Sequence, residues 1–308
     1  MRVAVVDIGT NSTRLLIADV DARNGSLAEL VRRSEVTRLG AGVDADRKLA
    51  RDACERVYSR LDEYAGAIAE HGCEANLAVL TSAVRDAANG REFADTVRDR
   101  YDLDARVLSG DEEAELTFLG AMSGRAPADE PTVVIDIGGG STEFIIGIRR
   151  SAGFHTSLPV GVVRMSERHI RTDPPRAAEL EELADDVRGV LAQGLPAAER
   201  DRVSLAIAVA GTATSAASIE QRLDPYDPER VHRYVLTLDA VDALRERLAA
   251  LDEAQRREVV GLNPDRAPTI VAGMIVLGEA IRAFALERAE VSEHDILYGG
   301  ALRLAGVG

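Results

Sequence analysis

One short segment occurs twice in this chain, and this repeat constrains the fold more than any other feature. Residues 7–17 read DIGTNSTRLLI and residues 136–146 read DIGGGSTEFII, so six positions are identical without a gap. Each copy follows an apolar run, VAVV or TVVI, and leads into another apolar run. Two apolar runs joined by Gly, Ser, Thr and Asn predict a β-hairpin. The chain is therefore expected to contain two closely related hairpins.

The repeat extends from the hairpins to whole domains. Asp7 and Asp136 are 129 positions apart, and Val79 and Val209, which lie in later predicted strands, are 130 positions apart. A spacing that holds across each half indicates a duplicated domain. The 308 residues leave room for two domains of about 150 residues each. We predict domains at 1–124 and 125–308, of which the second has extra helices and a C-terminal helix that can pack back on the first domain.

The pattern of apolar residues places the remaining elements. A small, polar segment with prolines at 123–131 is the predicted linker. The first half is expected to contain strands at 3–7, 13–19, 27–37, 75–80 and 105–108, and helices at 49–70, 90–100 and from 109 onward. For the second half we expect strands at 132–136, 142–148, 153–158, 203–210 and 289–292, helices up to about 194 and at 239–250, 253–260 and 266–287, and a loop at 224–230.

Charge and cysteine content exclude several classes of function. With 37 basic and 52 acidic residues the net charge is −15, which disfavours binding to nucleic acid or to an anionic membrane. Cys54 and Cys73 form no metal or disulfide pattern, which favours a reducing cytoplasm. The N-terminal apolar run is too short for a signal peptide. The longest apolar stretch, 269–286, contains Glu279 and Arg282 and is expected to be a buried helix rather than a membrane span.

The glycine-rich turns suggest phosphate binding. The segment GGGST at 138–142 can bring backbone amides against an anion, because glycine tolerates unusual dihedral angles and has no Cβ. Two such turns, one from each domain, would grip an anionic group from both sides of a cleft. The alternative is that both are ordinary hairpin turns, and the matched pair favours the phosphate interpretation.

The two copies differ at one position that matters for chemistry. Arg14 in the first copy corresponds to Glu143 in the second. Asp136 and Glu143 lie on adjacent strands of one predicted hairpin, and two carboxylates beside a phosphate site suggest Mg²⁺. Two structural alternatives remain: Glu143 pairs with an arginine, or Asp136 satisfies turn amides.

Two further segments follow predicted strands. TSAVRDAANG at 81–90 presents Arg85, which can bind phosphate or be an ordinary surface residue, and GTATSAAS at 211–218 can present helix N-terminal amides. The helix that begins with SGDEEAE has Ser109 as a candidate N-cap, and acidic residues in a first turn are favourable for the helix dipole alone. Its position just before the linker suggests that one of these carboxylates overhangs the cleft.

Together these motifs resemble a known family. DIGTNSTR, TSAVRDAAN, LSGDEEAELTFLG, DIGGGSTE and VAGTATS occur in the order found in the exopolyphosphatase/guanosine pentaphosphate phosphohydrolase (Ppx/GppA) family. The resemblance implies α/β domains of the duplicated ribonuclease-H-like type, as in actin, sugar kinases and Hsp70, with an active site in the interdomain cleft. The chain ends without the C-terminal helical domains of longer members, so it resembles the short, two-domain form, for which we expect short substrates.

The resemblance also implies roles for individual residues. Glu113 corresponds to the catalytic base, and Asp136 and Glu143 correspond to ligands of Mg²⁺ or Mn²⁺. The implied phosphate contacts are Asn11, Ser12, Thr13, Arg14, Arg85, Gly138, Gly139, Gly140 and Ser141.

The family resemblance implies an activity, and three alternative functions remain open. The resemblance implies a homodimer that hydrolyses the terminal phosphoanhydride of polyphosphate, and the cysteine content favours the cytoplasm. The alternatives are a guanosine pentaphosphate (pppGpp) 5′-phosphatase, a sensor of these anions without turnover, and an actin-like kinase or ATPase.

Overall fold

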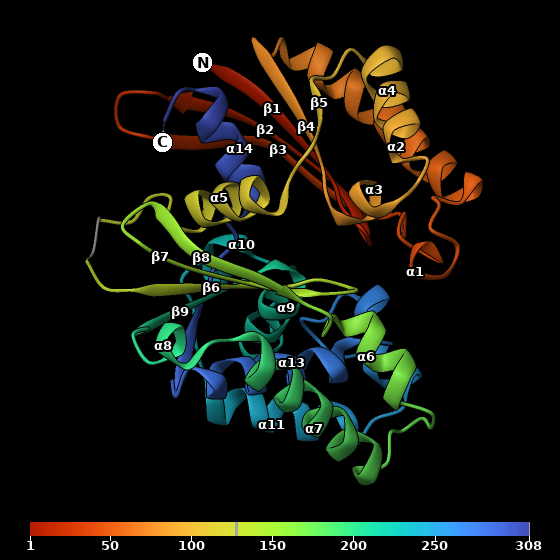
Figure 1. Cartoon of the computed structure of the whole chain (residues 1–308), viewed down its shortest axis with the longest axis vertical. Helices are drawn as coiled ribbons and strands as arrows, with labels where there is room; N and C mark the ends of the chain where they lie inside the picture. Colours follow the sequence, from red (N-terminus) through yellow and green to blue (C-terminus); the bar gives the residue numbers. More distant parts are fainter. Residues whose placement is uncertain (127–128, 308) are drawn as a thin grey trace. The chain divides into compact units, whose positions relative to one another are not determined.

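Two separate β-sheets form the two halves of the chain in the computed structural model (Figure 1). The structure describes residues 1–126 and 129–307, and the side chains of all of these except 44 and 45. One unit consists of residues 1–126 and 294–307, and the other of residues 129–293. The end of the chain therefore belongs to the first unit. Positions 127–128 of the predicted linker lie outside the described residues.

The first unit contains a five-stranded sheet with the order β3-β2-β1-β4-β5. β1 (Arg2–Ile8) pairs antiparallel with β2 (Ser12–Asp21), and β2 pairs antiparallel with β3 (Ser26–Val36). β4 (Ala75–Leu80) lies parallel to β1, and β5 (Ala105–Val107) lies parallel to β4. The hairpin and meander that we predicted for this half are confirmed.

Helices cover both faces of this sheet (Figure 1). Successive residues of a strand face opposite sides, so Ala4 and Val6 of β1 pack in one core and Val3 and Val5 in another. α2 and α4 cover the first face, and α5 and α14 cover the second. The helices of this unit are α1 (Val43–Asp46), α2 (Arg51–His71), α3 (Ser82–Asp86), α4 (Gly90–Tyr101), α5 (Gly110–Ala121) and α14 (Ile296–Leu304).

The second unit repeats the order of the first and extends it. Its sheet runs β10-β11-β9-β6-β7-β8, so the order β8-β7-β6-β9 corresponds to β3-β2-β1-β4. In both units the first three strands are antiparallel and the fourth lies parallel to the first. The duplicated α/β architecture is therefore confirmed. The strands are β6 (Thr132–Ile137), β7 (Thr142–Ile148), β8 (Ser151–Leu158), β9 (Leu205–Val209), β10 (Val235–Thr237) and β11 (Arg288–Val291).

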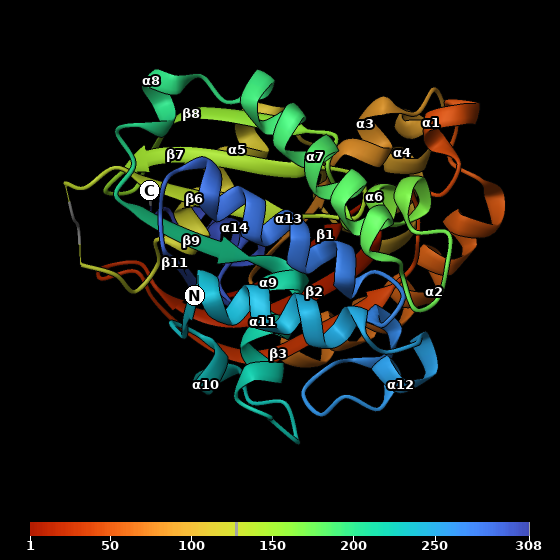
Figure 2. The same ribbon diagram turned by 90° about the horizontal axis from the view of Figure 1, so that it is seen from below.

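The additional helices of the second unit pack over one face of its sheet. α13 lies between α7 and α11, and all three contribute to one large core with residues of β6 and β7 (Figure 2). The helices are α6 (Val162–His169), α7 (Ala177–Gly194), α8 (Ala197–Arg200), α9 (Ala210–Glu220), α10 (Pro228–Val231), α11 (Leu238–Ala249), α12 (Glu253–Arg257) and α13 (Ile270–Ala283), with a 3₁₀ turn, η1 (Pro264–Arg266).

Several predicted boundaries differ from the structure for local reasons. The predicted helix 266–287 is shorter, because Pro268 cannot donate an N–H inside a helix and α13 begins after it. The predicted loop 224–230 contains the start of α10, whose N-cap Asp227 accepts hydrogen bonds from the amides of Glu229 and Arg230. The short elements α3 and β10 were missed, because they are too brief to show periodicity.

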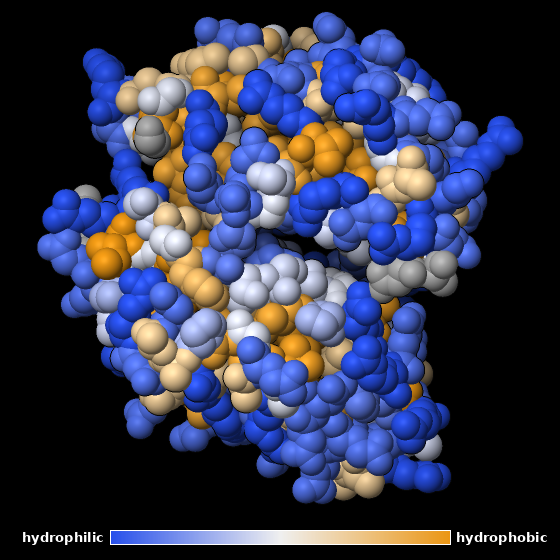
Figure 3. Space-filling view, viewed as in Figure 1, coloured by the Kyte–Doolittle hydropathy of each residue, from blue (hydrophilic) through white to orange (hydrophobic). Residues whose placement is uncertain are grey.

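The polarity of the surface and of the helices is consistent with the charged composition of the chain. Among the described residues, no helix is both long and apolar enough to cross a membrane. On the face shown in Figure 3, most residues are hydrophilic and the hydrophobic ones appear in separate groups. The net charge of −15 is consistent with a largely polar surface.

Candidate functional site

The two repeated turns are closed by the same hydrogen bond. In the first hairpin the amide of Gly9 donates to the carbonyl of Ser12 at 3.0 Å, and in the second the amide of Gly138 donates to the carbonyl of Ser141 at 2.9 Å. Asp7 is the cross-strand partner of Arg14, and Asp136 is the cross-strand partner of Glu143. The two hairpins therefore share register as well as sequence.

The turn of the second hairpin is braced by the start of α6. The carbonyl of Gly138 accepts from the amide of Val162 at 2.9 Å, and the carbonyl of Gly139 accepts from the amide of Val163 at 2.9 Å. The carbonyl of Gly140 accepts from the amide of Gly161 at 3.3 Å. Helix α6 thus uses its N-terminal donors, which have no partner within the helix, to hold three consecutive turn carbonyls.

This bracing determines where the turn amides point. In a trans peptide the N–H is directed opposite to the carbonyl of the preceding residue. The amides of Gly139, Gly140 and Ser141 therefore point away from α6. Within residues 1–126 and 129–307, no acceptor is found for these three amides. Successive backbone amides with a common direction form an anion-binding concavity.

The first turn is braced in the same way. The carbonyl of Thr10 accepts from the amide of Gly40 at 2.8 Å, and the carbonyl of Asn11 accepts from the amides of Thr37 and Arg38 at 3.0 and 2.9 Å. The amides of Asn11 and Ser12 therefore point away from residues 37–40. In both units the bracing segment directly follows the third strand of the sheet.

Thr13 differs from its predicted role. Its side chain is fully buried, and its hydroxyl forms a 2.9 Å hydrogen bond with the hydroxyl of Thr37. The equivalent Thr142 is also fully buried, and its hydroxyl donates to the carbonyl of Val160 at 2.9 Å. The hydroxyl of Thr13 is therefore a structural group that links the hairpin to residues 37–40, the segment that binds the turn carbonyls. The structure does not present this hydroxyl to a phosphate.

Arg14 is also held by the protein. Its guanidinium donates to Asp7 Oδ2 at 2.6 and 2.9 Å and forms a second ion pair with Asp295. Burial raises the pKa of Asp7 although Arg14 opposes this. Burial also acts to raise the pKa of Asp295, but Arg14, Arg32 and the amide of Leu297 outweigh it and bring this pKa below its usual value. In this structure Arg14 is paired with two buried carboxylates and is largely shielded from solvent.

The second hairpin has a carboxylate pair where the first has an ion pair. Asp136 and Glu143 are half-buried and lie on the same face of the sheet, because cross-strand partners do so. No group of three or more His, Cys, Asp and Glu side chains within the described residues is arranged to hold a metal ion. Mg²⁺ is usually bound by one or two carboxylates, with waters and substrate phosphates completing its octahedron. Asp136 and Glu143 fit that donor set.

Arg85 and Glu113, both predicted to be functional, form an ion pair. Arg85 on α3 donates from Nη1 to Glu113 Oε2 at 3.0 Å and to the carbonyl of Leu108 at 2.9 Å. Both side chains are partly exposed, by 32% and 21%. A guanidinium and a carboxylate that meet at a solvent-accessible position can each reach a ligand.

The structure separates the acidic residues at the start of α5. Ser109 and Glu112 form a capping box, and hydrogen bonds from the Ser109 amide and hydroxyl lower the pKa of Glu112. Glu115 pairs with Arg303 at 3.3 Å. Glu112 thus has the helix-capping role that propensity alone predicted for the whole group, whereas Glu113 pairs with Arg85.

Two arginines of the second unit, of which one contacts the second hairpin, were missed by the sequence analysis. Arg164 on α6 donates from Nε to the carbonyl of Gly140 at 2.8 Å. The guanidinium of Arg266 lies against Gly211, where a Cβ would come within 1.6 Å of Nη1. Arg164 could have been identified from the sequence, because it is a basic residue in the first turn of the helical region predicted after the strand at 153–158. No local signal identified Arg266, because its contact depends on tertiary packing.

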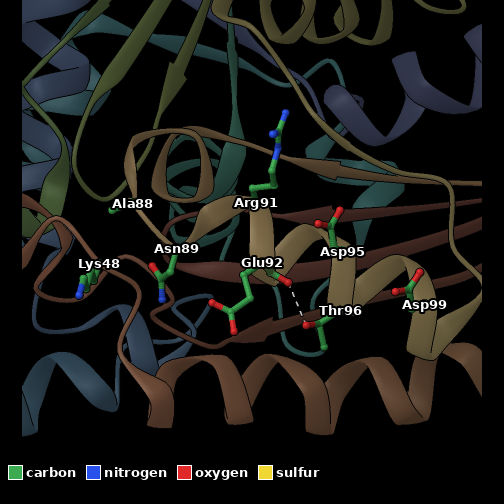
Figure 4. Close-up of a pocket in the computed structure, with 8 residues that line it drawn as sticks. All are labelled: Lys48, Ala88, Asn89, Arg91, Glu92, Asp95, Thr96 and Asp99. Atoms are coloured by element: carbon green, nitrogen blue, oxygen red, sulfur yellow. Dashed lines mark hydrogen bonds between the residues drawn. The ribbon is translucent and has the colours of Figure 1, made fainter.

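A surface pocket of about 660 Å³ lies elsewhere in the first unit, along α4 and the residues before it. Figure 4 shows its lining, in which Lys48 and Arg91 are accompanied by Glu92, Asp95 and Asp99. None of the predicted site residues lines this pocket. Its mixed charge does not favour an anion.

Comparisons with known proteins match the whole chain. The model of the Ppx/GppA phosphatase family matches residues 16–303. Exopolyphosphatase 2 of Mycobacterium tuberculosis is 36% identical over 318 residues, which cover 99% of this chain and 99% of that protein. The crystal structure of the Aquifex aeolicus Ppx/GppA family member has a TM-score of 0.86 at 29% identity and covers 99% of this chain and 97% of that one. An exopolyphosphatase from Cytophaga hutchinsonii has a TM-score of 0.88 at 27% identity and covers 100% and 99%.

Proposed function

We propose, since this chain belongs to the Ppx/GppA phosphatase family, that it is an exopolyphosphatase that hydrolyses the terminal phosphoanhydride of inorganic polyphosphate. The observation that carries the proposal is the braced turn of the second hairpin, where the amides of Gly139, Gly140 and Ser141 point the same way beside two carboxylates. An anion cradle next to a candidate metal site suits phosphoryl transfer, because that reaction needs positioning and charge stabilisation above all.

The residues have separate roles in this proposal. The turn amides and the guanidinium of Arg85 bind the terminal phosphoryl group. Glu113 accepts a proton from water as the water oxygen bonds to phosphorus and the P–O bond to the rest of the chain breaks, which releases orthophosphate. Mg²⁺ or Mn²⁺ bound by Asp136 and Glu143 would neutralise charge on the phosphate oxygens. Asn11 and Ser12 contribute through their amides, whereas Thr13 and Arg14 hold the first hairpin in shape.

Arg85 and Glu113 depend on each other before substrate arrives. Their 3.0 Å ion pair keeps the guanidinium and the carboxylate oriented toward each other. A terminal phosphate offers Arg85 a second anion, for which its planar guanidinium is well suited. As Arg85 engages the phosphate, Glu113 becomes available to the attacking water.

Several finer points of the proposal follow from the family rather than from the contacts. We propose short polyphosphate chains as substrates, a homodimer, and action in the cytoplasm. The 5′-phosphate of pppGpp is a second candidate substrate, because its hydrolysis breaks the same type of bond. A sensor without turnover is the rival from another class, and the Glu113–Arg85 pair favours a hydrolase over it.

The deciding experiment measures orthophosphate release from polyphosphates of several lengths and from pppGpp with Mg²⁺. We compare the native protein with Glu113→Gln and, as a matched control, Glu115→Gln on the same helix. Removing a general base costs about 10²- to 10⁴-fold in rate, so Glu113→Gln should be nearly inactive and Glu115→Gln active. Native protein that binds these anions without releasing phosphate would instead support the sensor.

A further inference from the structure

One oxygen of Glu143 accepts two hydrogen bonds from serine hydroxyls. Ser141 Oγ donates to Glu143 Oε1 at 2.6 Å, and Ser157 Oγ donates to the same oxygen at 2.7 Å. Distances of about 2.5–2.7 Å are typical of a hydroxyl bonded to an ionised carboxylate. The other oxygen, Oε2, lies on the side of the turn, 4.0 Å from the point that a Cβ on Gly138 would occupy.

The sheet register brings these groups together. Glu143 on β7 lies directly opposite Ser157 on β8, just as it lies opposite Asp136 on β6. Ser141 precedes Glu143 by two residues at the end of the turn. A carboxylate in the middle strand therefore has a hydroxyl from one neighbouring strand and a carboxylate from the other.

We propose that Ser157 is a positioning residue for the metal site, and that with Ser141 it holds Oε1 of Glu143 and so orients this carboxylate for metal binding. This inference rests on the proposed role of Asp136 and Glu143 in metal binding. The hydroxyl of Ser141 then acts on the carboxylate, and its amide contributes to the anion cradle.

The physical reason is the freedom of a glutamate side chain. The terminal torsion of a glutamate is broad, so the carboxylate of an unrestrained Glu143 would rotate. Two donors fixed on different segments hold Oε1 and thereby set the plane of the carboxylate. Partners of this kind that orient a metal ligand typically contribute about 10- to 100-fold in metal affinity.

The test measures Mn²⁺ binding without substrate, by the loss of the free-ion electron paramagnetic resonance signal. Ser157→Ala should weaken Mn²⁺ binding by about 10-fold or more. Ser157→Thr keeps the hydroxyl and should restore most of the affinity. Ser151→Ala, an exposed serine on the same strand, is the matched control and should bind as the native protein does. Thermal unfolding of each variant shows whether the fold is kept.

The outcomes separate this inference from the proposed function. If Ser157→Ala binds Mn²⁺ with native affinity, or if Ser157→Thr is as weak as Ser157→Ala, the positioning role is overturned while phosphate release by the native protein still supports the hydrolase. If the native protein binds Mn²⁺ but releases no phosphate, the proposed function fails, and the comparison of the serine variants still decides the positioning role. A native protein that binds no Mn²⁺ overturns the inference.

Discussion

Thr13 and Thr142 are equivalent residues of the two hairpins, and each is fully buried with its hydroxyl bonded to the segment that follows the third strand of its own sheet. The same segments bind the turn carbonyls. Each turn that we propose as an anion cradle is therefore shaped by a tertiary contact as well as by its own sequence. Substitutions in the bracing segments and in the nearby ion pairs can test these contacts separately.

The first prediction concerns Gly161, which allows the brace to approach the turn. A Cβ at this position would lie 2.4 Å from the backbone of Gly139 and Gly140, which is too close for any side chain. Gly161→Ala should therefore displace the turn and lower kcat/KM by about 100-fold, the loss typical when one oxyanion donor is removed. Phosphate release from polyphosphate measures this effect.

A second glycine supplies the control. Gly189 lies inside α7, and no atom lies within 4 Å of the position that a Cβ would occupy there, so Gly189→Ala adds a methyl group to open space. This variant should keep full activity and gain about 1 kcal/mol of stability from helix propensity. Full activity of Gly161→Ala would show that the brace does not shape the cradle.

The second prediction concerns Arg164, which binds the carbonyl of Gly140. Without the Arg164 side chain, the Gly140 carbonyl keeps the 3.3 Å hydrogen bond from the amide of Gly161. The Ser141 amide belongs to the same peptide group, so its orientation is then held less firmly. Arg164→Ala should raise KM by about 10-fold, the cost of one charged hydrogen bond. Arg168→Ala, one turn later on α6, removes an exposed pair with Asp186 and should leave KM unchanged. Equal KM values for the two variants would contradict the positioning role of Arg164.

The third prediction concerns the pair of Arg85 and Glu113. Arg85→Ala removes the proposed phosphate ligand and should lower kcat/KM by about 100-fold. Arg85→Lys should recover only part of this loss, because an ammonium cannot bond the Leu108 carbonyl and two anions in the planar geometry of a guanidinium. Arg98→Ala is the control, since Arg98 also binds one carboxylate and one carbonyl, of Asp95 and Ala105. A fully active Arg85→Ala would remove this residue from the mechanism.

The sequence predicts the repeated parts of this molecule better than the unique ones. The two hairpins, their register and the repeated succession of the first four strands along each half of the chain follow from one duplicated motif and its spacing. Local propensity could not distinguish Glu112 from Glu113, because both suit the first turn of α5. The structure distinguishes them by their partners, the Ser109 cap for Glu112 and Arg85 for Glu113.

Sequence patterns could not predict contacts between segments that are distant in the chain. Arg14 was predicted to bind phosphate, yet one of its partners is Asp295, which is 281 positions away. Thr13 was predicted from its place in the turn motif, yet its hydroxyl is bonded to Thr37, in a segment that has no motif of its own. In both cases a residue of the repeated motif has a structural partner that only the folded chain supplies.

The fourth prediction concerns the pH dependence of stability at Asp295. The folded-state pKa of Asp295 is lowered, so this carboxylate contributes stability above its unfolded pKa of about 3.9, and that contribution is lost as the pH falls through the folded value. Asp295→Asn removes one of the two carboxylates that pair with Arg14 in a buried site. Because Arg14 keeps its pair with Asp7, the variant should lose roughly 1.5–3 kcal/mol of unfolding free energy at pH 7, the cost of a hydrogen bond between charged groups. The difference from the native protein should shrink as the pH falls below about 4.

Urea unfolding between about pH 3 and pH 7 measures both effects. Asparagine can still accept the N-cap bond from the amide of Leu297, so the loss reports the ion pair and not the cap of α14. Asp252→Asn is the matched control, because Asp252 caps α12 through the amide of Gln255 and forms no ion pair within the described part of the chain. A difference between native protein and Asp295→Asn that stays constant with pH would show that the Asp295 charge is not what stabilises this site. A difference that shrinks on acidification requires an ionised Asp295 beside Arg14.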